Sequence, residues 1–281
     1  MTTIVMTGGS SGVGAVLLSR LLDMGHEVWN LDIRPGDSST DKATFVHCDL
    51  GDQGSIDGIL PRLPEKIDAL LNVAGIAQAR TPEQLIGVNF LGLRHLTDAI
   101  LEKMPPGGRI VSVSSVAGRT WQARYENILP LLETVTMDEG ISWCANNHKI
   151  IGKDPYTFSK RCLTAYTMRM AKQTMEKGVV INCVSPGPID TPLYPEFEAY
   201  MGKDQSDWFI SQTGRMAEPS DIAQVIEFLA IGHCKWLNGV DIPVDGGYSA
   251  GVDSGWIDVG TSPLMQQIKA KKAVQHSPTS H

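Results

Sequence analysis

The sequence predicts an α/β protein built on a parallel sheet, and two observations support this prediction. Short apolar segments with the length of buried strands alternate with longer segments of helical periodicity. Glycine-rich or polar motifs follow several of these apolar segments. The predicted strands cover residues 3–6, 27–31, 44–47, 68–72, 108–114, 179–184 and 239–244. Ligands bind at the carboxyl ends of parallel strands, so we expect the functional residues in these motifs.

The composition is typical of a single globular domain. The chain has 281 residues, of which 42% are hydrophobic and 20% are charged. A net charge of −7 without a basic stripe argues against a nucleic-acid partner. No apolar run approaches the roughly 18 residues of a membrane span, and the N-terminus does not resemble a signal peptide. We therefore expect a cytoplasmic protein with no membrane partner, and the five scattered cysteines predict no metal site.

A glycine-rich loop, Thr7 to Gly14, follows the first predicted strand and precedes a helical segment. This order of elements forms phosphate-binding sites, because glycines let the backbone approach a pyrophosphate and the helix N-terminus offers free N–H groups. We expect the loop to bind a nucleotide cofactor; a purely structural turn is the alternative. The expected contacts are Gly8, Ser10, Ser11, Gly12, Val13 and Gly14.

Asp32 stands at the end of the second predicted strand, with Ile33 beside it. A carboxylate at this place can bind both ribose hydroxyls of an adenosine and repels a 2′-phosphate, which favours NAD(H) over NADP(H). Arg34 could serve a phosphate, so NADP(H) stays the less favoured cofactor, and a turn-capping role for Asp32 is the alternative. After the third strand, Asp49 is placed to contact the adenine edge.

The ends of the later strands carry small and turn-forming residues against which a cofactor could lie. Ile189 and Thr191, after the sixth strand, are expected to contact a nicotinamide carboxamide. The further expected cofactor contacts are Leu50, Asn72, Ala74, Gly75, Pro186 and Gly187.

Tyr156 and Lys160 lie four residues apart at the start of a predicted helix, which Asp154 can cap and Pro155 can open. Both side chains would share one face of that helix. An ammonium near the phenol lowers the pKa of the tyrosine toward working pH, so that it can act as a general acid or base. Chance spacing on a solvated face is the alternative for this pair alone.

Two further polar residues are candidates for the same site. A serine at the end of the fifth strand, in the Ser114–Ser115 pair, can donate to a substrate oxygen or cap a turn. Asn89 lies inside an apolar helix predicted over residues 81–103, where a buried amide needs partners. It could bond nearby backbone or hold a water that leads to Lys160.

Two segments depart from the alternating pattern. Residues 119–153 contain two short helical patterns, which predict an inserted helical segment. Residues 193–215 are rich in large apolar side chains, which predicts a lid over an apolar pocket; ordinary helix packing is the alternative. The expected pocket residues are Val116, Trp121, Leu193, Tyr194, Phe197 and Trp208. Residues 1–261 are expected to form the domain, and the polar residues 262–281 a flexible tail.

Eight motifs agree in order and spacing, and together they resemble the short-chain dehydrogenase/reductase family over residues 3–248. They are TGGSSGVG at 7–14, Asp32, CDL at 48–50, NVAG at 72–75, Asn89 in VNFLG, SSVAG at 114–118, YTFSK at 156–160 and SPGPIDTP at 185–192. The resemblance implies a doubly wound (Rossmann) parallel sheet of seven strands in a single domain. It also implies a catalytic set of Ser115, Tyr156, Lys160 and Asn89.

Ser115 and Tyr156 are unusually far apart in sequence for this family, because residues 119–153 separate them. This insertion and GRMAEPSD at 214–221 make the chain similar to bacterial 3α-hydroxysteroid dehydrogenases/carbonyl reductases and also to coniferyl-alcohol dehydrogenases. The resemblance implies an NAD(H)-dependent enzyme that interconverts a secondary or allylic alcohol and a carbonyl on a bulky apolar substrate. It further implies a homodimer, with a tetramer as the alternative.

The sequence leaves the substrate open, since a steroid, a terpenoid and a phenylpropanoid all fit an apolar pocket. A non-catalytic NAD-sensing protein is a remote alternative, because all four members of the catalytic set are present. A sugar-nucleotide epimerase or dehydratase would require a different glycine spacing and a larger C-terminal region.

Overall fold

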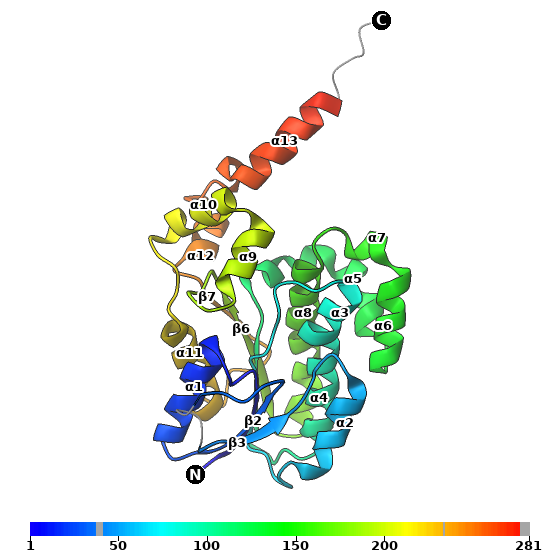
Figure 1. Cartoon of the computed structure of the whole chain (residues 1–281), viewed down its shortest axis with the longest axis vertical. Helices are drawn as coiled ribbons and strands as arrows, with labels where there is room; N and C mark the ends of the chain where they lie inside the picture. The colour runs from blue at the N-terminus through cyan, green and yellow to red at the C-terminus, as the bar shows by residue number, and fades with distance from the viewer. Residues whose placement is uncertain (38–41, 233, 276–281) are drawn as a thin grey trace, which may run out of the picture.

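The computed structural model describes residues 1–37, 42–232 and 234–275, and it consists of a seven-stranded parallel sheet between two layers of helices (Figure 1). The strand order is β3-β2-β1-β4-β5-β6-β7, which confirms the doubly wound sheet. The strands are β1 (Thr3–Thr7), β2 (Glu27–Asp32), β3 (Thr44–His47), β4 (Ala69–Asn72), β5 (Arg109–Val113), β6 (Val180–Pro186) and β7 (Asp241–Val244).

The helices cover both faces of the sheet (Figure 1). They are α1 (Gly12–Asp23), α2 (Gln53–Ile59), α3 (Pro82–Ile86), α4 (Gly92–Leu101), α5 (Tyr125–Leu132), α6 (Met137–Asn146), α7 (His148–Ile151), α8 (Pro155–Glu176), α9 (Tyr194–Met201), α10 (Lys203–Thr213), α11 (Pro219–Ile231), α12 (Tyr248–Ser254) and α13 (Pro263–Gln275). Helices α1 and α11 bury one face, and α2, α4 and α8 bury the other. None of the described helices is both long and apolar enough to cross a membrane.

Each face of the sheet has its own apolar core. Leu70 and Ile110 belong to the cluster beneath α4 and α8, whereas Met6, Leu71 and Ile226 belong to the cluster beneath α1 and α11. Leu70 and Leu71 are neighbours in sequence and point to opposite faces, as the two-residue period of a strand requires. Burial on both faces explains why the central strands β1 and β4 are almost continuously apolar rather than alternating.

The strand order reverses between β1 and β4, which are parallel neighbours with Thr7 opposite Asn72. The chain leaves β1 toward β2 on one side and returns through β4 on the other. In open α/β sheets this reversal leaves a crevice at the carboxyl ends of the strands, where ligands bind. The glycine-rich loop after β1 and the motif after β4 therefore meet at one crevice.

The inserted segment forms helices α5, α6 and α7, which pack on α3, α8 and the turn between α3 and α4. Arg94 of α4 is buried beneath it. Its guanidinium donates to the carbonyl oxygens of Leu131 (3.2 Å) and Thr136 (3.2 Å) and to the Thr134 hydroxyl (3.1 Å). One buried cation thus fastens the connection between α5 and α6 to the body of the domain.

The C-terminal segment, for which a flexible tail is expected, contains helix α13. Helix α13 begins where the Ser262 hydroxyl accepts from the Met265 N–H (3.3 Å), and Gln205 of α10 accepts from the Leu264 N–H (3.0 Å). These caps form the helix although its sequence lacks a strong apolar period. Figure 1 shows α13 extending away from the sheet. The expectation for residues 276–281 lies outside the described residues.

Candidate active site

The glycine-rich loop packs too tightly for larger residues at two positions. A Cβ at Gly8, which has a φ of +72°, would lie 2.7 Å from the backbone of Ala74. A Cβ at Gly14 would lie 1.9 Å from the carbonyl oxygen of Gly8. Glycines at these positions let the loop turn directly from β1 into α1 and rest on the end of β4.

The loop leaves a helix N-terminus open toward the crevice. Ser11 is the N-cap residue of α1, and its side chain makes no capping hydrogen bond to the described helix. The first N–H groups of α1 therefore keep their capacity to bind an anion, with Gly12 in a left-handed conformation (φ +54°). These features fit the pyrophosphate of a dinucleotide cofactor.

Residues at the end of β2 hold the loop in place. The Asn30 side chain accepts from the Gly9 N–H (2.9 Å) and donates to the Ser10 hydroxyl (3.0 Å). The Asp32 carboxylate accepts from the Ser10 N–H (3.1 Å) and the Arg34 N–H (3.4 Å). Asp32 is only half-buried, so its carboxylate stays accessible beside the loop. The sequence interpretation missed Asn30, whose polar side chain inside an apolar strand was the available signal.

Three other expected cofactor residues differ in their surroundings. Ile33 is 61% exposed, and Leu50 is buried in the core. Asp49 is exposed, and its carboxylate accepts from the Gly51 N–H (2.8 Å). Its second oxygen faces no protein donor among the described hydrogen bonds, so a cofactor amine could still reach it.

Thr7 joins the loop to the fourth strand. Its hydroxyl accepts from the N–H groups of Val73 and Ala74, each at 3.1 Å. Asn72 lies just before them and donates to the hydroxyls of Thr97 (2.9 Å) and Ser112 (3.2 Å). The residues expected to line the cofactor at the end of β4 are therefore fixed by hydrogen bonds from three elements.

Helix α8 starts as the sequence predicts and brings Tyr156 and Lys160 onto one face. Asp154 Oδ1 accepts from the Thr157 N–H at 2.8 Å, and Pro155 occupies the first turn. The Lys160 Nζ atom lies 5.8 Å from the centre of the Tyr156 ring. It donates to the carbonyl oxygen of Val113 at 2.9 Å, and the side chain is 4% exposed.

Burial shifts the pKa of both side chains away from their usual values. It raises the pKa of Tyr156 to about 12, against a hydrogen bond with Ser115 that lowers it, and the Asp154 charge raises it further. Burial also lowers the pKa of Lys160 to about 8. The expectation that Lys160 depresses the tyrosine pKa is therefore wrong for this structure. Burial of the phenol has the largest effect on this pKa, and the Lys160 ammonium is bonded to the Val113 carbonyl.

The structure separates the two candidate serines. Ser115 lies at the start of a 3₁₀ turn (Val116–Thr120), accepts from the Ala117 N–H (3.2 Å) and lies close enough to the Tyr156 phenol to lower its pKa. Ser114 instead bonds the Thr164 hydroxyl (2.7 Å) and the carbonyl oxygen of Lys160 (3.2 Å). Ser115 both caps the turn and meets the tyrosine, whereas Ser114 fastens β5 to α8.

Asn89 lies in a π-helical turn, Gly87–Leu91, that interrupts the long helix predicted there. Its amide accepts from the Ile76 N–H (2.8 Å), donates to the Ile76 carbonyl (2.9 Å) and reaches the Ser159 hydroxyl (3.4 Å). A Cβ at Gly75 would lie 3.4 Å from Asn89 Oδ1 and 3.6 Å from Lys160 Nζ. Asn89 and Lys160 therefore border the same small space, and π turns often occur at functional sites.

The segment after β6 closes the crevice. Ile189 pairs with Ala217 in an isolated parallel bridge, with hydrogen bonds from Asp190 N–H to Ala217 O (2.9 Å) and from Ala217 N–H to Pro188 O (2.9 Å). The Thr191 methyl would lie 3.4 Å from a Cβ at Gly12. Thr191 thus faces the glycine-rich loop across the crevice. The Ile189–Ala217 bridge joins the residues on either side of the expected lid, 193–215.

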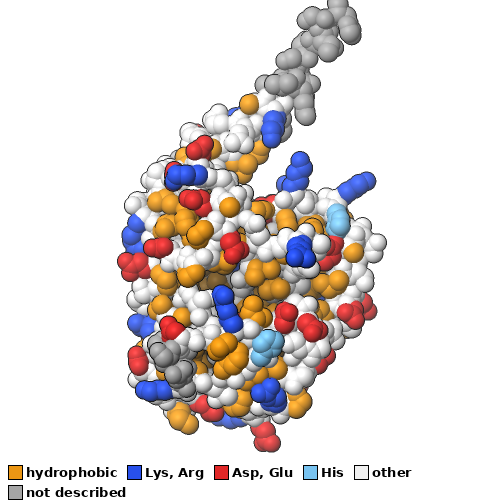
Figure 2. Space-filling view, in the orientation of Figure 1, with side chains coloured by type: hydrophobic (Ala, Val, Ile, Leu, Met, Phe, Trp, Pro, Cys, Tyr) orange, Lys and Arg blue, Asp and Glu red, His pale blue; other side chains and the backbone are white. Residues whose placement is uncertain are grey.

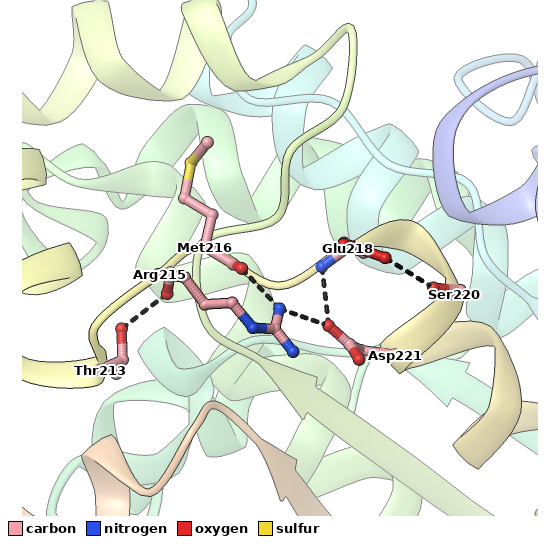
Figure 3. A network of polar contacts seen from close by, with 6 residues as sticks. All are labelled: Thr213, Arg215, Met216, Glu218, Ser220 and Asp221. Atoms are coloured by element: carbon pink, nitrogen blue, oxygen red, sulfur yellow. Dashed lines mark hydrogen bonds and ion pairs between the residues drawn. The ribbon is translucent and has the colours of Figure 1, made fainter.

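The C-terminal end of the lid is held by a polar network (Figure 3). Arg215 donates to the Asp221 carboxylate (2.7 Å) and to the Met216 carbonyl (2.7 Å), and Asp221 also accepts from the Glu218 N–H (2.8 Å). The network borders a cavity of about 300 Å³. The residues that line this cavity include Gly187 but neither Ser115 nor Tyr156, so it lies apart from the candidate catalytic group.

Only part of the lid reaches the catalytic group. Phe197 of α9 packs edge-on against Tyr156, with ring centres 5.0 Å apart. Trp208 of α10 packs against Tyr248 of α12 at 6.3 Å. Tyr194 bonds the Ser206 hydroxyl and thereby links α9 to α10. Leu193 precedes α9 and is half-buried. On the face shown in Figure 2, hydrophobic side chains gather in the middle of the molecule.

Two of the expected pocket residues, Val116 and Trp121, lie after β5 rather than in the lid. Val116 is half-buried and opens the 3₁₀ turn that Ser115 begins, so it lies next to the serine. Trp121 follows this turn and packs edge-on against Tyr125 at 5.9 Å. In the described part of the chain, no three His, Cys, Asp or Glu side chains form a group that could hold a metal ion.

Comparisons with known proteins identify the class to which this fold and site belong. A family model described as short chain dehydrogenase matches residues 2–126, and one described as enoyl-(acyl carrier protein) reductase matches residues 140–249. A coniferyl-alcohol dehydrogenase from Pseudomonas sp. (strain HR199) is 36% identical over 88% of this chain and 96% of its own length. The chain therefore belongs to the short-chain dehydrogenase/reductase family, whose members are oxidoreductases that bind nicotinamide cofactors.

Two further relatives agree with this assignment. A 3-alpha-hydroxysteroid dehydrogenase/carbonyl reductase from Comamonas testosteroni is 29% identical over 89% of this chain and 97% of its own. The crystal structure of a 3-alpha-hydroxysteroid dehydrogenase from Pseudomonas sp. B-0831, complexed with NADH, matches with a TM-score of 0.76 and 25% identity. That match covers 90% of this chain and 99% of the other.

Proposed function

We propose that the protein is an NAD(H)-dependent alcohol dehydrogenase/carbonyl reductase that interconverts a secondary or allylic alcohol and a carbonyl on a bulky apolar substrate. The observation that carries this proposal is that Tyr156 lies near Ser115 and packs against Phe197. A proton-transfer group and a hydrogen-bond donor lie close together, and an aromatic ring packs against the proton-transfer group. This arrangement suits a substrate with one oxygen and an apolar body.

The four polar residues take distinct roles in this reaction. Ser115 binds the substrate oxygen and stabilises the charge that develops there. Tyr156 gives a proton to that oxygen during carbonyl reduction and removes it during alcohol oxidation. Lys160 orients the tyrosine and binds the cofactor ribose, and Asn89 shapes the space beside Lys160 in which a relay water is held. NAD(H), when bound, supplies the hydride acceptor or donor.

The pKa of Tyr156 bears on the direction of the reaction. With a pKa of about 12, the phenol keeps its proton at neutral pH and is a ready general acid. Carbonyl reduction is therefore favoured near neutral pH, and alcohol oxidation is favoured as the pH rises. A bound substrate and cofactor bring their own charges to the site, and these charges also shift the pKa of Tyr156.

The cofactor preference rests on Asp32. Its half-buried carboxylate lies beside the glycine-rich loop, where the adenosine ribose of a dinucleotide would be held. A 2′-phosphate at this place would meet the negative charge, so NAD(H) is favoured over NADP(H). Arg34 is exposed, and its backbone N–H is bonded to Asp32, so its guanidinium is free of that bond and could partly accommodate NADP(H).

A hydroxysteroid-type substrate is the first candidate, and an aromatic alcohol of the coniferyl type is the second. The second is favoured by one observation: the relative named coniferyl-alcohol dehydrogenase is 36% identical, against 29% for the hydroxysteroid relative. A terpenoid alcohol also fits an apolar pocket. Measuring NADH formation with one alcohol of each of the three classes tests the proposal. Formation with at least one supports it, and no NADH with any bulky alcohol, despite NAD binding, contradicts it.

The assembly and location follow from the same proposal. Helices α5 to α7 cover part of α3 and α8, which removes a helical face from subunit contact and supports a homodimer rather than a tetramer. Residues 1–261 form the catalytic unit of each subunit in this proposal, and the protein works in the cytoplasm. Light scattering of the purified chain measures the subunit number, and a tetramer would contradict the dimer.

A further inference from the structure

The two lid helices are attached to the protein in different ways. Helix α10 has buried residues, among them Phe209, which stacks on Tyr248 of α12 with ring centres 4.0 Å apart. Gln205 of the same helix accepts from the backbone of Leu264 (3.0 Å). In α9, whose residues are all described, none is buried. Apolar packing therefore holds α10, whereas α9 depends on a few specific contacts.

One of these contacts, from Tyr194 to the Ser206 hydroxyl, joins α9 to α10 near the start of α9. The other two join α9 to elements outside the lid. The Tyr200 hydroxyl donates to Asp154 Oδ1 at 2.6 Å, and Gln78, from the loop after β4, donates to the Glu196 carbonyl at 2.9 Å. Between the hydrogen-bonded residues of α9, Phe197 meets Tyr156. Asp154 is at the same time the N-cap residue of the helix that carries Tyr156.

The joint between the two helices is a glycine with a backbone that other residues rarely adopt. Gly202 has a φ of +86° and a ψ of 141°, and a Cβ there would meet nothing within 4 Å. A glycine with free space around it can change its backbone angles without a clash of its own, so α9 can change its angle to α10 at this position. Helix α9 can therefore move about Gly202, and the Tyr200 hydrogen bond to Asp154 opposes this movement.

We propose that Tyr200 is a positioning residue: its hydrogen bond to Asp154 fastens α9 to the start of the catalytic helix and so holds Phe197 against Tyr156. The proposal rests on the proposed function, since it describes how the same site is covered. Tyr200 itself does not touch the reacting atoms. Its loss lets α9 swing at Gly202, which opens the apolar cover over the tyrosine while α10 stays in place.

Hydrogen exchange of the cofactor-free protein tests the contact without any turnover. In Tyr200→Phe, the amides of residues 194–201 should exchange faster, while those of 203–213 keep the wild-type rate. Tyr125→Phe is the matched control, because it removes a phenol hydroxyl that is bonded to Arg169 of α8 and not to Asp154. Unchanged exchange in residues 194–201 overturns the proposal. This measurement tests the Tyr200–Asp154 contact even if the protein oxidises no alcohol.

Steady-state kinetics provide a second test of the proposal. In Tyr200→Phe, KM for a bulky alcohol should rise by about three- to tenfold, with kcat and the Kd for NADH within about twofold of wild type. Asp154→Ser keeps a good N-cap but is too short to reach Tyr200. The double variant should therefore be no worse than either single one. Fully additive effects, or an unchanged KM in Tyr200→Phe, would show that the pair does not act together.

Discussion

Phe197 lies edge-on against Tyr156, with ring centres 5.0 Å apart and ring planes at 76°. One ring belongs to the lid and the other to the first turn of α8, so this contact joins the substrate cover to the proton-transfer group. An edge-to-face pair is a favourable aromatic geometry. The contact explains how one structure combines an apolar pocket with a tyrosine whose pKa burial raises to about 12.

Removing the Phe197 ring should weaken binding of large substrates more than that of small ones. For Phe197→Ala we expect KM for a bulky apolar alcohol to rise by about tenfold, because the half-buried ring loses apolar contact with the substrate worth about 1.4 kcal/mol. A small alcohol should change far less. Phe228→Ala removes a ring that is 51% exposed on α11 and should leave both values unchanged. Equal losses for large and small substrates would place Phe197 outside the pocket.

The cofactor preference should depend on the Asp32 charge. In Asp32→Ala we expect the ratio of the Kd for NADPH to the Kd for NADH to fall by about tenfold or more, since the repulsion of the 2′-phosphate is lost. Fluorescence titration with each reduced cofactor measures this ratio. Asp49 provides the control, since its carboxylate accepts from the Gly51 N–H. Asp49→Asn should leave the ratio close to wild type. An unchanged ratio in Asp32→Ala would contradict the assignment.

The pH dependence of alcohol oxidation should respond to Asp154. The Asp154 charge raises the pKa of Tyr156, and the tyrosine must lose its proton to act as a base. Neutralising the carboxylate in Asp154→Asn lowers this pKa, so the rise of the oxidation rate with pH should move to lower pH. Asparagine preserves the N-cap. An unchanged position of this rise, or a shift to higher pH, in Asp154→Asn would refute the account.

The insertion should depend on Arg94 for its stability. Arg94→Met removes a buried guanidinium that satisfies Leu131, Thr134 and Thr136, and leaves their oxygens without this donor. We expect the free energy of unfolding to fall by about 2–4 kcal/mol. Arg62 is exposed, and Arg62→Met should change it by less than about 0.5 kcal/mol. Urea denaturation measures both, and equal effects would show that Arg94 does not anchor the insertion.

The parts of the fold that local patterns determine were predictable from the sequence. The strand boundaries follow from apolar runs, and Gly8 and Gly14 mark the loop because only glycine permits its close contacts. Asp154 and Pro155 marked the start of α8 correctly, since capping depends on neighbours in sequence. The family comparison confirmed the class that these motifs together indicated.

Features that depend on distant residues were not predictable in this way. The Asn30 bond to Gly9 and the Tyr200 bond to Asp154 join segments that the fold alone brings together. The π turn at Asn89 left no mark in an otherwise helical pattern. The sequence led us to expect a lowered pKa for Tyr156. The four-residue spacing indicates a nearby lysine, but it does not indicate how far burial desolvates the phenol.

The central claim is that Tyr156 performs the proton transfer, and Tyr156→Phe tests it most directly. The change removes only the phenol hydroxyl and keeps the ring that packs on Phe197. NADH binding, measured by fluorescence titration, should stay within about twofold of wild type, while kcat should fall by a factor of about 10² or more. Turnover at the wild-type rate with intact NADH binding would contradict the assignment.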